Sequence, residues 1–118
     1  MNPEPLNECL KEYIEKRTET LRRLHSRIIE MIKELSSKLP ESINEINEFL
    51  KRVDVVEDVF NKDVEIINFI LGIYRKYKSD PARSDLVREF LHKTADMYAD
   101  VMIDLDELRE RTLIKCRT

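Results

Sequence analysis

The stretch of residues 6–39 contains neither proline nor glycine, so no helix breaker interrupts it. Its apolar residues recur at alternating spacings of three and four, at Leu10, Ile14, Leu21, Leu24, Ile28, Met31 and Leu35. This spacing predicts a helix with one apolar face, because side chains turn by about 100° per residue around a helix axis. Such a helix runs roughly 50 Å at ~1.5 Å per residue, too long for one compact core to surround. The chain therefore needs further helices of similar length.

The same spacing resumes after Pro40 and continues to about Lys78, which predicts one long second helix. Its weak part is residues 53–63, because the valines there are indifferent helix formers and Asn61 or Asp63 can cap a new helix. Gly72 costs helix stability relative to alanine, so we expect it to allow close approach of a neighbouring helix.

Ser79-Asp80-Pro81 supplies a cap residue followed by proline at a first helical position, which predicts the start of a last helix reaching about Lys115. Short connections between long apolar-striped segments favour an antiparallel arrangement. We therefore predict a single all-α domain over residues 1–118: an elongated up-down-up bundle of three long helices, or alternatively four helices if the second breaks near Asn61.

The two cysteines, Cys9 and Cys116, distinguish these arrangements. In the three-helix bundle they lie at opposite ends, whereas a break near Asn61 reverses the last helix and brings them close. Their spacing does not suit a metal site. We expect both to be reduced, partly buried residues.

The formal net charge of −3 opposes nonspecific binding to nucleic acid. No apolar run is long enough to span a membrane, so we expect no membrane partner. The N-terminal residues lack the charged-then-apolar pattern of a signal peptide, so we expect a cytoplasmic protein. The chain combines many charged residues with no glutamine, a composition like that of thermophile proteins.

The acidic residues are the first candidates for chemistry. Glu45 and Glu48 are three residues apart, which resembles the paired acidic motifs of helical nucleoside-triphosphate pyrophosphatases. Asp100 and Asp104 fall in a run of acids on the last helix. Hard cations prefer several oxygen ligands, so these four residues are candidate Mg²⁺ ligands. The alternative, which we favour, is a solvated acidic surface.

Three charged residues fall on or beside the apolar faces, namely Arg17, Glu57 and Asp104. A polar layer of this kind can set helix register or oligomeric state. In the alternative interpretation, Val56 and Leu105 take the inner positions and the two acids face solvent.

No catalytic grouping is readable, and a single glycine rules out a phosphate-binding glycine loop, so the sequence predicts neither a catalytic site nor a cofactor. We expect a non-enzymatic helical protein that forms a homo-oligomer or binds a protein partner. Apolar residues of the first helix outside its main stripe, Tyr13, Ile29 and Ile32, are the expected partner contacts. The alternatives are a Mg²⁺-dependent pyrophosphohydrolase and a nucleic-acid-associated subunit that uses the arginines at 22, 23 and 27 and the basic residues of 109–117.

Overall fold

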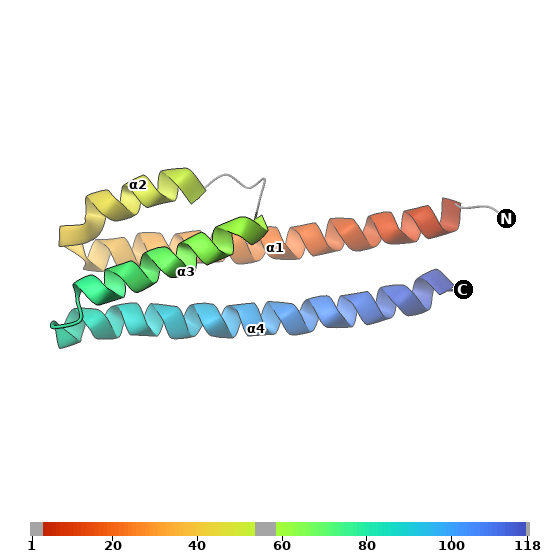
Figure 1. Ribbon diagram of the computed structural model, residues 1–118. Helices are drawn as coiled ribbons and strands as arrows, with labels where there is room; N and C mark the ends of the chain where they lie inside the picture. Colours follow the sequence, from red (N-terminus) through yellow and green to blue (C-terminus); the bar gives the residue numbers. More distant parts are fainter. Residues whose placement is uncertain (1–3, 54–58, 118) are drawn as a thin grey trace.

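The computed structural model describes the backbone of residues 4–53 and 59–117 and the side chains of residues 8–53 and 64–117. It is an elongated bundle measuring 64 × 24 × 18 Å (Figure 1). In chain order its elements are α1 (Glu4–Lys38), the short 3₁₀ turn η1 (Pro40–Ser42), α2 (Ile43–Val53), α3 (Val59–Lys76) and α4 (Pro81–Arg117). These ranges contain no strand, which confirms the predicted all-α bundle.

The two longest helices, α1 and α4, lie side by side and antiparallel along the molecule (Figure 1). Helix α1 ends just before Leu39 and Pro40, because the residue before a proline is disfavoured in helical geometry. Helix α4 begins at Pro81, as predicted. Asp80 caps it, since its carboxylate accepts a 3.4 Å hydrogen bond from the backbone N–H of Arg83.

The second segment is two helices rather than one. Helix α2 ends at Val53 and α3 begins at Val59, so the three-helix prediction is wrong and the four-helix alternative is confirmed. Asn61, where a break was expected, lies inside α3. Residues 54–58 lie outside the described part of the chain.

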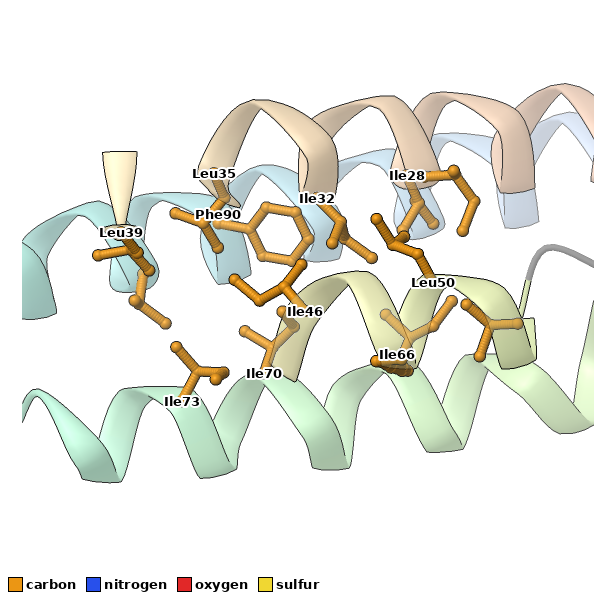
Figure 2. Close-up of a cluster of buried hydrophobic side chains, with 14 of the residues drawn as sticks. Ile28, Ile32, Leu35, Leu39, Ile46, Leu50, Ile66, Ile70, Ile73 and Phe90 are labelled. Carbon is orange, nitrogen blue, oxygen red and sulfur yellow. The ribbon is translucent and has the colours of Figure 1, made fainter. Parts of the chain in front are cut away.

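The hydrophobic core lies where all four helices run together (Figure 2). Ile28 and Ile32 of α1 meet Ile46 of α2 and Ile70 of α3, and all four side chains are fully buried. Phe90 brings α4 into the same cluster. This core fills one half of the molecule, the half that contains η1 and the turn between α3 and α4.

Gly72 does not serve the purpose that we expected of it. A Cβ atom added there would meet no heavy atom within 4 Å, and the residue is exposed. The predicted close approach of a neighbouring helix is therefore wrong.

Cys9 and Cys116 form a disulfide, with their Cα atoms 5.9 Å apart. The expectation of two reduced cysteines is wrong, and the reason is topological. The extra reversal between α2 and α3 makes α4 antiparallel to α1, so the two chain ends lie at the same end of the bundle (Figure 1). The disulfide joins the helices at that end.

Beyond the start of α3, α1 and α4 continue as a pair of helices that α2 and α3 do not cover (Figure 1). We call residues 8–23 of α1 and 102–117 of α4 the stalk. Within these two ranges the buried residues are Cys9, Leu21 and Leu105, and every other residue is exposed or half-buried. Among the described residues, the stalk is therefore the part of the fold whose apolar side chains are least buried.

Candidate functional site

The four candidate metal ligands do not converge. Glu45 and Glu48 are exposed on α2, where they pair with Lys76 at 3.5 Å and Lys51 at 3.3 Å. Asp100 and Asp104 are exposed on α4. Among the residues that the structure describes, no group of three or more His, Cys, Asp or Glu side chains is placed to hold a metal ion. The geometry therefore gives no support to a carboxylate metal site.

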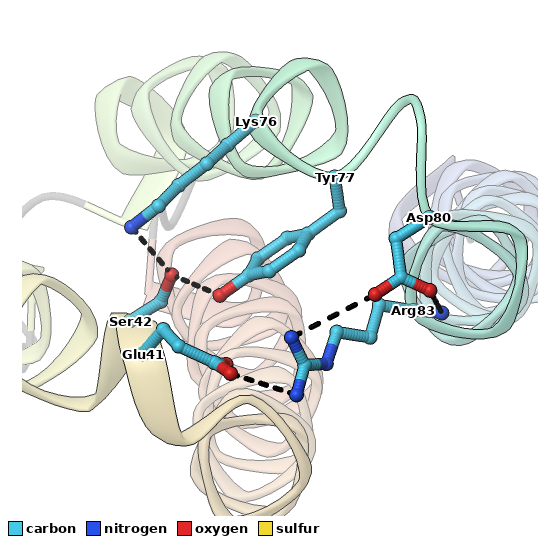
Figure 3. A network of polar contacts seen from close by, with 6 residues as sticks. All are labelled: Glu41, Ser42, Lys76, Tyr77, Asp80 and Arg83. Carbon is cyan, nitrogen blue, oxygen red and sulfur yellow. Dashed lines mark hydrogen bonds and ion pairs between the residues drawn. The ribbon is translucent and has the colours of Figure 1, made fainter.

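A polar network lies at the end of the bundle opposite the disulfide (Figure 3). The Ser42 and Tyr77 hydroxyl oxygens are 2.7 Å apart, and Lys76 Nζ donates to Ser42 Oγ at 3.0 Å. Arg83 connects Glu41, at 2.7 Å, with Asp80, at 3.7 Å. These contacts link η1 to the end of α3 and the start of α4.

A serine beside a lysine also occurs in hydrolases, where the lysine activates the serine as a nucleophile. Here Ser42 has no solvent-accessible surface, so a substrate cannot reach its oxygen. The network is a structural connection between the helix turns.

His25 has a structural role as well. It is buried, and its Nε2 lies 3.0 Å from the carbonyl oxygen of Val53, the last residue of α2. A carbonyl can only accept, so Nε2 donates to this backbone oxygen at the end of α2. His92, by contrast, is exposed on α4.

Two of the three expected partner contacts are core residues. Ile29 is 4% exposed and Ile32 is fully buried, and both belong to the cluster formed with α2 and α3. The expectation that they face a partner is wrong, because the wide apolar stripe of α1 serves two neighbours within the bundle. Tyr13 is half-buried and borders a groove of about 280 Å³ beside the disulfide, between α1 and α4.

Of the three residues predicted to form a polar layer, Asp104 does not lie inside the bundle. Asp104 is exposed on α4, while the neighbouring Leu105 is buried, as the alternative interpretation required. Arg17 is half-buried on α1. Glu57 lies outside the described residues.

The stalk carries an uncovered apolar surface that was not predicted from the sequence. Leu10 and Ile14 of α1 are 44% and 59% exposed, and Met102 and Leu113 of α4 are 57% and 45% exposed. We call these four residues the stalk face. A continuing apolar stripe predicted Leu10 and Ile14 to be buried, and that prediction is wrong because α2 and α3 do not extend this far.

The stalk face lies on the side of the α1/α4 pair against which α2 and α3 pack. Ile14 precedes the core residue Ile28 by two heptads on the same stripe. Met102 follows Arg88 by the same interval, and Arg88 donates a 3.1 Å hydrogen bond to the Tyr74 hydroxyl of α3. Leu113 follows Met102 by three helical turns. On α1 the stalk face thus continues the core side of the helix, and on α4 it continues the side that faces α3.

The tip of the stalk is held by charge as well as by the disulfide. Lys115 Nζ donates to Glu12 Oε2 at 2.9 Å, and Lys16 Nζ lies 3.0 Å from Glu12 Oε1. The hydrogen bond from Lys115 is the largest cause that lowers the pKa of Glu12 to about 2. Because this pKa lies below the ordinary 4.5, the interaction stabilises the tip above about pH 4.5 and is lost as the pH falls towards 2.

Replacing Lys115 should release this carboxyl group. We expect Lys115→Met to raise the pKa of Glu12 towards 4.5, because the larger of its two ion pairs is lost. The measurement is an NMR titration of the Glu12 side-chain carboxyl carbon. Lys93→Met is the control, since Lys93 pairs with Glu89 at 3.1 Å elsewhere on α4 and should leave Glu12 unchanged. An unchanged pKa of Glu12 in Lys115→Met would contradict the assignment.

The basic residues considered for nucleic-acid binding are dispersed. Arg22, Arg23 and Arg27 are exposed on α1, and Arg23 pairs with Glu19 one turn away. Those of the C-terminal end lie near the tip, where Lys115 pairs with Glu12 and Arg109 lies 4.0 Å from Asp106. Neither group forms a continuous positive surface of the kind that tracks a phosphate backbone.

The chain matches no protein-family model, no curated protein and no solved structure. Among the described helices, none is both long enough and apolar enough to cross a membrane.

Proposed function

We propose that this protein is a non-catalytic helical bundle that acts through protein–protein contacts on its stalk face. The observation that carries the proposal is the exposure of Leu10, Ile14, Met102 and Leu113 on one side of the stalk. Contiguous exposed apolar surface rimmed by charged residues is typical of interaction sites. The bundle core supplies a rigid support from which the stalk projects.

The disulfide bears on the cellular compartment. Disulfides are rare in cytoplasmic proteins, but those of hyperthermophiles are an exception. The thermophile-like composition is consistent with that exception, and we retain a cytoplasmic location as part of the proposal.

The proposal is tested by separating folding from surface function. The double variant Ile14→Gln/Met102→Gln should change the free energy of unfolding by less than about 0.5 kcal/mol, as for other exposed positions. Urea denaturation of dilute protein measures it. Leu21→Gln is the control on the same α1 stripe, where burial predicts a loss of about 2 kcal/mol or more.

Two results would contradict the proposal. If the double variant loses as much stability as Leu21→Gln, the stalk face serves folding rather than a partner. Hydrolysis of nucleoside triphosphates by the purified protein with Mg²⁺ would contradict the non-catalytic part and restore the pyrophosphohydrolase alternative.

A further inference from the structure

We propose that the partner of the stalk face is the stalk of a second copy of this chain, packed antiparallel to the first. This inference rests on the proposed function and names the partner. Two pairs of helices then form a four-helix arrangement at the centre of the dimer, and the two four-helix cores lie at opposite ends. Steric fit, charge and contact area support this arrangement.

Steric fit selects the antiparallel direction. The stalk face lies on the same side as α2 and α3, which stand as an additional helix layer on the α1/α4 pair. In a parallel dimer these layers from the two copies would oppose each other and hold the stalks apart, since packed helices are spaced by about 8–10 Å. In an antiparallel dimer each stalk lies in the space beyond the end of the other copy's α3.

The distribution of charged residues along the stalk helices favours this contact. A two-fold axis across the stalk places α1 against the α1 of the second copy, and α4 against its α4, each pair antiparallel. The outer half of the α1 stalk, residues 8–15, has three acids and one base, and the inner half, 16–23, has one acid and four bases. In α4 the order is reversed, with three acids and one base in residues 102–109 and one acid and three bases in 110–117.

Each outer half therefore meets an inner half of opposite net charge. The same alternation also pairs α1 with α4 within one chain, as the Glu12–Lys115 contact shows. In all four neighbouring pairs of helices in the dimer, the halves that face each other then carry opposite net charges. Electrostatic repulsion between helices therefore does not oppose the association.

The area indicates a weak dimer. Each stalk helix contributes sixteen residues, or roughly 24 Å, and two helices side by side give a contact footprint of roughly 500 Å². Standard stable interfaces bury about 800 Å² on each partner. We therefore expect a dissociation constant in the micromolar range, and the measurement must extend to high protein concentration.

Sedimentation equilibrium over roughly 5–500 μM, combined with small-angle X-ray scattering, tests the proposal. The mass should rise from monomer to dimer with concentration. The maximum dimension should rise from the 64 Å of one chain to roughly 100 Å, because two molecules of this length share only the stalk. Ile14→Gln/Met102→Gln should raise the dissociation constant about 100-fold or more, since each dimer buries both residues twice.

The chain offers a matched control on another face of the stalk. Ile103 and Ile114 are 57% and 67% exposed. Each follows Met102 or Leu113 by one residue, so it points in a different direction around the axis of α4. Ile103→Gln/Ile114→Gln should leave the dimer intact. A monomer at every concentration, a dimer no longer than one chain, or a dimer lost only in this control variant would each overturn the inference. If the monomer is found while Ile14→Gln/Met102→Gln folds with full stability, the proposed interaction function survives with a different partner.

Discussion

Loss of the Cys9–Cys116 disulfide should lower the free energy of unfolding by about 3–5 kcal/mol. The bond closes a loop with a sequence separation of 107, and in the chain-entropy model a loop of about 100 residues contributes about 4.7 kcal/mol. Domains are stable by only about 5–15 kcal/mol in total. The change is therefore a large fraction of the stability of this protein.

The measurement is urea denaturation of the oxidised protein and of Cys9→Ser/Cys116→Ser. A thiol reductant should reproduce the loss in the natural sequence and have no effect on the double variant. Amide hydrogen exchange adds a spatial test, because the stalk should lose protection before the residues around Ile28 and Ile70. Equal stability of the oxidised protein and the double variant would show that the bond does not restrain the unfolded chain as described.

Ile32→Ala should cost about 2–5 kcal/mol, because Ile32 is fully buried among α1, α2 and α3 and its loss leaves a cavity. Ile14→Ala removes the same atoms from the same helix, but Ile14 is 59% exposed. We expect that variant to cost less than about 1 kcal/mol. Thermal and urea denaturation of both variants measure the difference.

This pair also tests the correction to the expected partner contacts. If Ile32 were an exposed residue that contacts a partner protein, the two variants would have similar stability. A small effect at Ile32 together with a large effect at Ile14 would reverse the assignment of core and stalk along α1.

The all-α fold class and the two long helices α1 and α4 could be predicted from the sequence. The three-four spacing identified α1, and Asp80-Pro81 marked the start of α4 to the residue. The division of the second segment could not be decided. The apolar register continues through residues 53–63, and only the weak helix propensity of valine and a possible cap at Asn61 or Asp63 argued for a break. The number of helices in that segment determines the direction of α4. That direction determines whether the two cysteines lie close enough to form a disulfide.

The exposure of the stalk face could not be predicted from periodicity, for a related reason. Ile14 and Ile28 occupy equivalent positions in one repeating pattern, yet Ile14 is 59% exposed and Ile28 is fully buried. A periodic stripe tells which side of a helix is apolar, but burial depends on whether another helix reaches that level. The lengths of α2 and α3, 11 and 18 residues against 35 in α1, carry that information.

The disulfide also determines how this molecule would carry a mechanical load. Cys9 and Cys116 lie near the two ends of the chain, and the covalent bond between them connects those ends directly. Tension applied through segments outside the two cysteines would pass along the sulfur–sulfur bond. The helices between them would bear none of it, so the bundle would stay folded under forces that unravel an unlinked helical protein. After reduction, the same tension would peel α1 from α4 from the stalk tip inwards.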